Sequence, residues 1–445
     1  MKTLSKKIML MMSLFLASVA FTACSSSDDD GGGTGSSPIT DGPQESTAKC
    51  LVPAFSESEL RWGFINENGE FVIAPQFYYA EMFDAELGLA SVYTENSHCF
   101  MDSLGNIKTL PVSFDYIKPF LNGFTIVRKD GLYGLVNTNF DYVIQPKYKD
   151  IIPMSLDGET QCYISPDGFI KCQDENGKYG YINTKGETVL DFKYDFIYDI
   201  IGNISENGLI ACGRSIYHQG MTGKHIVYHY INIQGETVIN PSTNFYDAGQ
   251  FHNGVAIVNT SNAFGIEGNY GLINERGSYV VSPQYGSLSY IGDNRYIFAK
   301  YDEKRRYLYG IIDSSGKEII PATYYRIGNF TDDGVAVART SLNGKYGYID
   351  KNGSVVIDFL YKDANEFNNG YAEVTNIDDT RLLINRSGDV IMTLQENETA
   401  EFRSGLFFID SSTESESHYK EEGRYVNILG KTVYSWSVEG DKIYE

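Results

Sequence analysis

The chain has little cysteine and a shortage of positive charge. Only 6 of its 445 residues are cysteine, which excludes the disulfide framework of small secreted domains. Lysine and arginine total 36 against 58 aspartate and glutamate, so the formal net charge is −22. Such a charge argues against a nucleic-acid partner on electrostatic grounds. The single basic cluster, Lys304 to Arg306, predicts a solvated hairpin tip.

Long hydrophobic runs are missing after residue 24. No later segment predicts a transmembrane helix, and no apolar period of 3.6 residues continues for three turns. Phosphate-binding loops, dinucleotide fingerprints and nucleophile elbows are missing as well. These absences argue against a helical fold, and we expect a protein that is not an enzyme, with no cofactor and no catalytic residue.

Histidine is also scarce, with 6 in the chain. His218, His225 and His229 lie close in the sequence, and the last two would share one face of a strand. A zinc site needs three or four convergent ligands, whereas these three flank a loop that contains glycine. We therefore interpret them as surface histidines on an inserted hairpin and expect no metal site.

Residues 1–23 have the features of an export signal. Lysines precede an apolar segment, residues 8–20, that is too short to span a bilayer. Phe-Thr-Ala-Cys then ends at Cys24 and resembles the lipobox of bacterial lipoproteins, with Phe21 where that family usually has leucine. The resemblance implies cleavage before Cys24 and a lipid on it, which would make the membrane a partner.

Residues 24–52 predict a flexible tether, because this segment is rich in serine, glycine and acid and lacks hydrophobic periodicity. The run Asp28 to Asp30 resembles the surface-export signal of Bacteroidetes lipoproteins. That resemblance implies an outer-membrane lipoprotein exposed on the cell surface. A plain solvated linker, on a protein that faces the periplasm, is the alternative.

One short pattern recurs ten times in residues 53–445: aromatic-Gly-aromatic-Ile-Asx, two residues, Gly and an apolar run. Alternation before the Asx predicts a strand, and the apolar run predicts its return strand. Between them, Asx and Gly predict a type I turn in which the Asx side chain bonds the backbone. The clearest turn pairs are Asn66 and Gly69, Asn183 and Gly186, Asp313 and Gly316, and Asp350 and Gly353.

The turn residues are more constant than the aromatic-Gly pair. All ten copies have the Asx, nine have the Gly, and six have the aromatic-Gly pair. The missing Gly is replaced by Phe140, after Asn139, which tolerates a left-handed backbone. A third short strand precedes each copy. We therefore expect an all-β array of about ten three-stranded repeats, β-propeller-like or an open β superhelix.

The pattern resembles the WG repeat, also called the KWG repeat, of bacterial proteins over about residues 58–437. Most copies have tyrosine where the family has tryptophan, which only Trp62 keeps. The resemblance implies a β-rich repeat protein and provides no established catalytic residues.

A hairpin is also predicted between Cys162 and Cys172. If its loop is residues 166–168, Ser165 faces Phe169, and counting outward places the two cysteines opposite each other. Opposed strand residues lie within the range of a disulfide. Two buried thiols are the alternative.

Tyrosine is the over-used polar aromatic, with 34 copies. Many would fill the core between repeats, but others fall outside the core strands and could stack on sugars or peptides. The latter include Tyr78, Tyr79, Tyr217, Tyr324 and Tyr325.

The anchor, the tether and the repeat surface together predict a non-catalytic envelope lipoprotein. It would act as a binding or scaffold module for protein or glycan partners. A polysaccharide-processing component and a purely structural envelope protein are the alternatives.

Overall fold

The fold is described from a computed structural model. It describes residues 51–84, 87–95, 98–108, 114–118, 120–155, 161–165, 167–194, 201–217, 224–240, 245–261, 269–331, 334–414 and 418–441. The export signal, Cys24, most of the tether and His218 lie outside these residues. The described segments include no helix that is long and apolar enough to cross a membrane.

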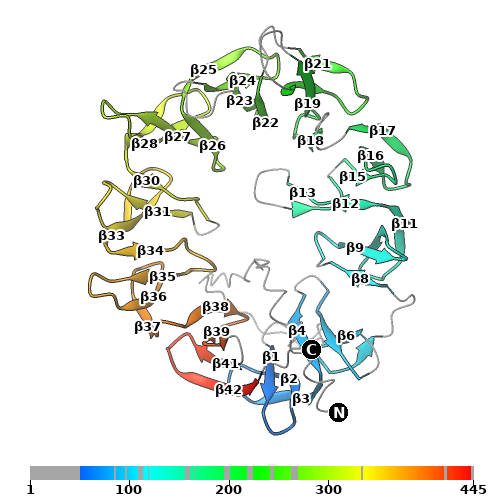
Figure 1. Cartoon of the computed structure of the whole chain (residues 1–445), viewed down its shortest axis with the longest axis vertical. Helices are drawn as coiled ribbons and strands as arrows, with labels where there is room; N and C mark the ends of the chain where they lie inside the picture. The colour runs from blue at the N-terminus through cyan, green and yellow to red at the C-terminus, as the bar shows by residue number, and fades with distance from the viewer. Residues whose placement is uncertain are drawn as a thin grey trace, which may run out of the picture. The chain divides into compact units, whose positions relative to one another are not determined.

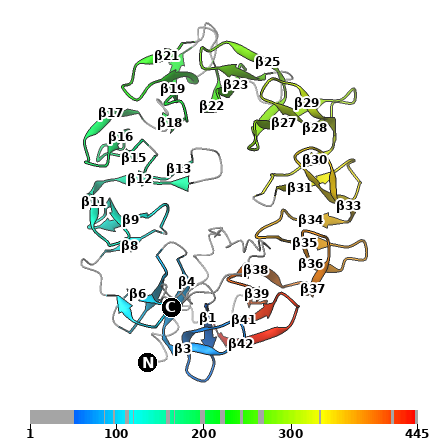
Figure 2. The ribbon, with the colours of Figure 1, turned by 180° about the vertical axis from the view of Figure 1, so that it is seen from behind.

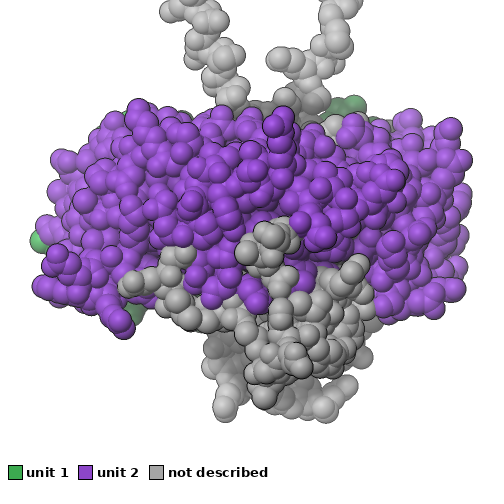
Figure 3. Space-filling model, turned by 90° about the horizontal axis from the view of Figure 1, so that it is seen from above, with its two compact units in different colours: residues 1–111, 368–445 green, residues 112–367 purple. Residues whose placement is uncertain are grey.

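The described part of the chain is all-β, with ten small antiparallel sheets of the propeller-blade type in sequence order and one further two-stranded sheet (Figure 1). The view from behind shows the same order (Figure 2). The chain folds into two compact units: residues 1–111 with 368–445 form unit 1, and residues 112–367 form unit 2 (Figure 3). We number the sheets 1 to 10.

Unit 2 contains sheets 3 to 8, each with four strands. Sheet 3 contains β8 (Tyr116–Ile117), β9 (Phe124–Lys129), β10 (Leu132–Asn137) and β11 (Tyr142–Tyr148), and sheet 4 contains β12 (Asp150–Ile152), β15 (Phe169–Gln173), β16 (Tyr179–Asn183) and β17 (Thr188–Tyr194). Sheet 5 contains β18 (Ile201–Ile204), β19 (Ile210–Tyr217), β20 (Lys224–Ile231) and β21 (Thr237–Ile239), and sheet 6 contains β22 (Asp247–His252), β23 (Val255–Asn259), β24 (Tyr270–Asn274) and β25 (Tyr279–Tyr285). Sheet 7 contains β26 (Ser287–Tyr290), β27 (Arg295–Tyr301), β28 (Tyr307–Asp313) and β29 (Glu318–Tyr324), and sheet 8 contains β30 (Arg326–Ile327), β31 (Val335–Arg339), β32 (Tyr346–Asp350) and β33 (Val355–Tyr361). The short strands β13 (Met154–Ser155) and β14 (Gln161–Cys162) pair with each other, and β34 (Asp363–Ala364) is the last strand of the unit.

Unit 1 contains the first two sheets and the strands that end the chain. Sheet 1 contains β1 (Val52–Ser56), β2 (Arg61–Ile65) and β3 (Phe71–Phe77), and sheet 2 contains β4 (Tyr79–Phe83), β5 (Leu89–Tyr93), β6 (His98–Asp102) and β7 (Ile107–Lys108). Sheet 9 contributes β35 (Tyr371–Thr375), β36 (Arg381–Asn385) and β37 (Val390–Leu394), and sheet 10 contains β38 (Thr399–Arg403), β39 (Leu406–Asp410), β40 (Thr413–Glu414), β41 (His418–Asn427) and β42 (Thr432–Asp441). Since Leu51 and Val52 are buried, the β domain includes the last two residues of the predicted tether.

Most sheets have four strands, one more than the three strands predicted for each repeat. In unit 2 the segment interpreted as a crossing between repeats begins with the first strand of the next sheet, as in β12 and β30. These first strands have only two to four residues in most sheets, too few to show an alternating pattern.

The ten Asx turns explain the constant part of the repeat. In every copy the Asx side-chain oxygen accepts hydrogen bonds from the backbone N–H groups two and four residues later, at 2.8–3.1 Å. The nine glycines have φ angles of 77–87°. In the tenth turn the left-handed residue is Phe140 itself (φ 62°) and not Asn139. The Phe140 ring is buried against Phe120, which offsets the strain.

The turn glycines also lie against the outer strand of the preceding sheet. A Cβ at Gly277 would be 2.7 Å from Ile239 Cγ2, and one at Gly316 would be 2.8 Å from Val281 Cγ2. Real Cβ atoms do not approach so closely, so glycine is needed here for space as well as for its φ angle. In unit 1 the turn glycine of sheet 1, Gly69, lies against the backbone of Val433 in sheet 10.

The glycine of the aromatic-Gly pair has a different role. Tyr270 pairs with Tyr285 and Leu272 with Val281, so Gly271 faces three residues of a bulged return strand. All six copies with this glycine show the same register shift. A Cβ in any of them would lie at most 2.7 Å from the carbonyl oxygen ten residues later. Where Leu382 and Arg424 replace the glycine, the strands pair through that position without the bulge.

The hydrophobic core is divided into clusters, each shared by two consecutive sheets. Tyr181 of sheet 4, for example, packs with Ile210 of sheet 5, and similar clusters join the other neighbours within each unit. One further cluster joins sheet 10 to sheet 1, where Tyr425 and Trp436 pack with Val52. Within unit 1 the first and the tenth sheets therefore share a core cluster, as consecutive sheets do.

Candidate binding surface

The predicted opposition of Cys162 and Cys172 is wrong. The turn forms as expected, because Ser165 N–H donates to the Phe169 carbonyl at 2.9 Å. Beyond it the strands separate: Cys162 pairs with Met154, whereas Cys172 lies opposite Gly180. The two cysteines belong to different hydrophobic clusters and are not joined to each other.

Of the three histidines near the sheet 5 hairpin, His218 lies outside the described residues. His225 and His229 both lie in β20, four residues apart. Among the residues that the structure describes, no group of three His, Cys, Asp or Glu side chains could hold a metal ion.

Sequence reasoning missed a buried histidine that connects three successive turns of unit 2. The imidazole of His252 stacks on Tyr290, with ring centroids 4.1 Å apart and planes 9° apart. Its Nδ1 lies 3.9 Å from Glu206 Oε1, and the same carboxylate accepts a hydrogen bond from Asn253 N at 3.1 Å. Burial raises the pKa of Tyr290. This cluster connects sheets 5, 6 and 7, so we interpret it as structural.

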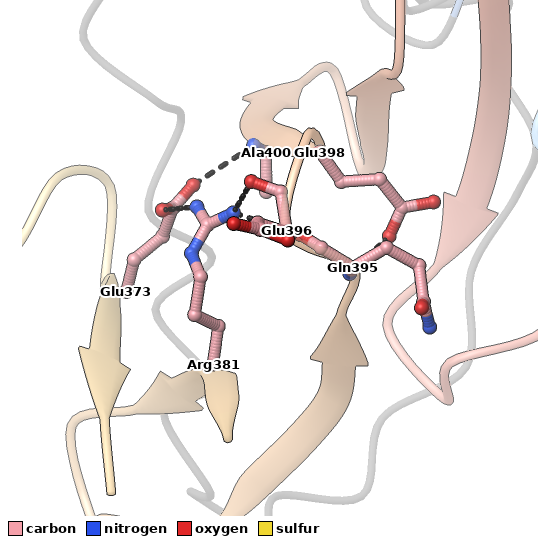
Figure 4. Close-up of polar contacts among 6 residues, drawn as sticks. All are labelled: Glu373, Arg381, Gln395, Glu396, Glu398 and Ala400. Atoms are coloured by element: carbon pink, nitrogen blue, oxygen red, sulfur yellow. Dashed lines mark hydrogen bonds and ion pairs between the residues drawn. The ribbon is translucent and has the colours of Figure 1, made fainter. Parts of the chain in front are cut away.

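A glutamate–arginine network has a similar role between sheets 9 and 10 (Figure 4). Arg381 donates to Glu373 Oε2 at 2.8 Å and to two carbonyl oxygens of the β37–β38 loop. Glu373 Oε1 accepts from Ala400 N at 2.9 Å, and buried Glu398 pairs with Arg424 at 2.8 Å. These carboxylates are occupied by contacts that hold the fold, which leaves no acid pair for catalysis in this network.

Two of the five tyrosines predicted to fall outside the core strands, Tyr78 and Tyr325, are half-buried beneath cations, whereas Tyr79, Tyr217 and Tyr324 lie at the ends of β4, β19 and β29. The guanidinium carbon of Arg61 lies 3.9 Å from the centre of the Tyr78 ring, and that of Arg339 lies 5.0 Å from the Tyr325 ring. Tyr79 packs edge-on against Trp62. Of the remaining two, Tyr324 lies opposite Tyr309, whereas the side chain of Tyr217 is outside the described part.

The longest of these cationic and aromatic surfaces lies on the β27–β28 hairpin. The two strands pair over seven residues each and end at the opposed pair Tyr301 and Tyr307. These rings stack with centroids 4.1 Å apart. The predicted hairpin tip follows: Lys304 to Arg306 are exposed, and Arg306 is held by Asp302 through its Nε at 2.8 Å.

The tip is an Asx turn with an arginine in the position of the glycine. Asp302 Oδ1 accepts from the N–H groups of Lys304 and Arg306 at 2.8 Å, and Arg305 has a φ of 57°. The corresponding hairpin of sheet 4 has Gly177 at this place, with a φ of 77°. A left-handed arginine costs roughly 1–2 kcal/mol. The Asp302 pattern, with arginine where glycine is expected, is the sequence signal that could have drawn attention to this hairpin.

The absence of a side chain at Gly286 leaves space for the Tyr307 ring. Its N–H donates to the Ala299 carbonyl at 2.8 Å, and a Cβ on it would collide with the Tyr307 ring. The same junction position in sheets 2 and 8 has Tyr78 and Tyr325. Glycine at this one junction therefore lets Tyr307 of the longer hairpin occupy the space.

Two arginines of sheet 8 continue this surface. β30, which contacts β28, begins with the exposed Arg326, whose strand partner is Arg339. The guanidinium of Arg339 lies 4.8 Å from the Tyr346 ring. The sheet that follows the hairpin therefore has cationic and aromatic groups in contact with each other as well. We name residues 300–307 with Arg326 and Arg339 the cationic hairpin surface.

The sheets and their turns define a β-propeller-type repeat protein. The profile of the WG containing repeat matches eight segments: residues 62–96, 100–133, 133–158, 179–210, 230–262, 270–304, 309–346 and 346–376. Together they cover more than half of the chain, which therefore belongs to the family of proteins with WG containing repeats. The matched segments end before the copies of sheets 9 and 10, where the motif glycine is lost.

Similar solved structures include a eukaryotic initiation factor, with 11% identity over 77% of this chain and 94% of that chain and a TM-score of 0.46. BamB from Moraxella catarrhalis has 11% identity over 75% of this chain and 97% of its own, with a TM-score of 0.32. The WD40 β-propeller domain of Doa1 has 12% identity over 68% and 90%, with a TM-score of 0.22. No curated protein sequence matches the chain.

Proposed function

We propose that the protein is a non-catalytic binding or scaffold module of the cell envelope, with a protein or glycan partner. One observation carries this proposal: an acidic repeat protein maintains an exposed cationic tip in a strained backbone conformation next to a stacked tyrosine pair. Strained backbone residues cluster at functional sites, so a strained and exposed arginine motivates a functional hypothesis.

The proposal includes a lipid on Cys24 that anchors the chain to the outer membrane, with the tether and the β domain on the cell surface. The lipobox-like residues before Cys24 and the acidic run after it support this placement. Cells that express the wild-type chain or Cys24→Ser test the anchor by incorporation of labelled fatty acid and by protease treatment of intact cells. Equal labelling of both chains contradicts the anchor, and protection of the wild type from protease contradicts surface exposure.

Binding is tested with the purified full chain on a glycan array and in cross-linking to isolated envelopes. We expect saturable binding to a defined glycan class or to one envelope protein. If both experiments show no saturable partner, the protein is a purely structural envelope component and the proposal is wrong. Release of reducing ends from a bound glycan would instead indicate a polysaccharide-processing enzyme.

A further inference from the structure

We propose that the cationic hairpin surface binds an acidic polysaccharide, whose carboxylate or sulfate groups pair with the cations while its sugar rings lie on the tyrosines. This inference rests on the proposed function and assigns it a ligand class and a site.

The first step is charge. Lys304 and Arg305 are exposed, and neither side chain forms an ion pair or hydrogen bond with the described part of the protein. Arg306 is oriented by Asp302, which leaves the tip with more cations than acids although the whole chain has a net charge of −22. Arginine binds carboxylate and sulfate-like oxygens in a bidentate manner, and lysine binds them as a point charge.

The second step is backbone strain. Sheet 4 makes the same turn with Gly177 and no strain, so the fold does not require a side chain at Arg305. The arginine is nevertheless present, and its left-handed backbone points to a use outside the fold. We assign that use to an external anion, since among the described residues neither Glu303 of the same tip nor any other acid forms an ion pair with Arg305.

The third step is the aromatic pair. Tyr301 and Tyr307 are half-buried and fixed by stacking, and Gly286 leaves room for the second ring. Rings fixed in this way lose little entropy when a ligand binds. A rigid aromatic pair beside cations suits contact with a pyranose ring that has an acidic substituent.

The fourth step is the continuation onto sheet 8. Arg326 is exposed and its strand neighbour Arg339 is stacked between the Tyr325 and Tyr346 rings. A second cationic and aromatic cluster next to the first suits a chain of repeated acidic units better than a single ion. The tyrosine rings favour a polysaccharide over an acidic peptide, and an oligonucleotide is tested as the competing polyanion.

The test uses the full chain in affinity electrophoresis through gels that contain polygalacturonate, sulfated dextran or neutral dextran, with isothermal titration for affinities. An oligothymidylate and a polyglutamate peptide complete the set. We expect binding to polygalacturonate or to sulfated dextran, whichever acidic group fits, and none to neutral dextran. Equal binding of all polyanions would show charge attraction alone and would overturn the assignment, as would preference for the peptide or the oligonucleotide.

Arg305→Gly is the decisive variant. It removes a cation and relieves the left-handed strain, so we expect roughly tenfold weaker binding together with an unchanged or higher melting temperature. Lys431→Glu is the matched control, because Lys431 is exposed in the Asx turn of sheet 10 and changes charge far along the sequence. It should bind like the wild type.

Three results separate this inference from the proposed function. If Arg305→Gly and Tyr307→Ala bind the acidic polysaccharide as tightly as wild type, the hairpin assignment is wrong but a glycan-binding function stands. If only neutral glycans bind, the ligand class is wrong. If no glycan binds and no envelope partner is captured, the proposed function fails as well.

Discussion

The hydroxyl of Tyr425 in the last sheet donates a 2.8 Å hydrogen bond to the carbonyl oxygen of Pro53 in the first sheet, 372 residues earlier. Within unit 2, Tyr230 makes the same kind of bond to Gly249 of the following sheet at 2.8 Å. The contact between sheet 10 and sheet 1 is therefore of the type that joins neighbouring sheets elsewhere.

Tyr425→Phe should lower the free energy of unfolding by about 1–2 kcal/mol, because it leaves a buried carbonyl without its donor. Denaturant titration followed by tryptophan fluorescence measures this, since Trp436 packs 5.8 Å from the Tyr425 ring. Tyr279→Phe, at a ring that is 42% exposed, is the control and should change nothing. Equal stability of Tyr425→Phe and wild type would contradict a stabilising contact between the ends.

Gly271→Ala should destabilise the protein by about 3 kcal/mol, because its Cβ would lie 2.5 Å from the Val281 carbonyl oxygen. Gly254→Ala separates crowding from backbone strain: Gly254 has a φ of 80° and open space around it. Gly254→Ala should lower the free energy of unfolding by about 1 kcal/mol. Thermal unfolding of both variants measures whether Gly271→Ala is the more destabilising substitution. If Gly254→Ala costs more, the bulge does not determine the motif glycine.

Asp350 should make its turn sensitive to acid. Burial alone would raise the pKa of this carboxyl, but hydrogen bonds from Ser354 and Asn352 outweigh it and lower the pKa below 3.8. A lowered folded-state pKa adds stability at neutral pH, which is lost as the pH falls through that pKa. Asp350→Asn keeps the acceptor oxygen without titrating, so its melting temperature should fall less between pH 6 and about pH 3. An identical fall in both proteins would contradict the role of this carboxylate.

Lys171 should oppose folding at neutral pH. Burial lowers its pKa to about 8, from 10.5. The folded state therefore loses this proton before the unfolded state does, and wild-type stability should rise as the pH increases from about 8 to 10.5. Lys171→Met should remove that rise and stabilise the protein at pH 7 by roughly 1–3 kcal/mol, allowing for partial exposure. Denaturation midpoints across this pH range measure it, and a parallel rise in the variant would assign the effect to other groups.

The hairpins were predictable because their determinants are local. An Asx, two residues and a glycine specify each turn through bonds within five residues, and all ten predicted Asx positions, including Asn66 and Asp350, make them. The family resemblance followed from the same residues.

Features that depend on distant partners were not predictable. Cys162 pairs with Met154 and not with Cys172, because β14 pairs with β13 in a separate two-stranded sheet and this pairing outweighs the count from the turn. The glycine of the aromatic-Gly pair is lost in four of the ten copies, so the sequence alone did not show that it is needed. The backbone that crowds Gly271 comes from the return strand. The strain at Arg305 is visible only once its φ angle is known.

The packing of sheet 10 on sheet 1 has a consequence for biosynthesis. β1 and β2 are synthesised long before β41 and β42. The apolar side chains of Val52 and Phe55 therefore lack their packing partner Trp436 until β42 has been made. Contacts at such sequence separation slow folding. An unfinished chain would expose this uncovered face to proteases and chaperones, and unit 1 becomes complete only after the final strand has been made.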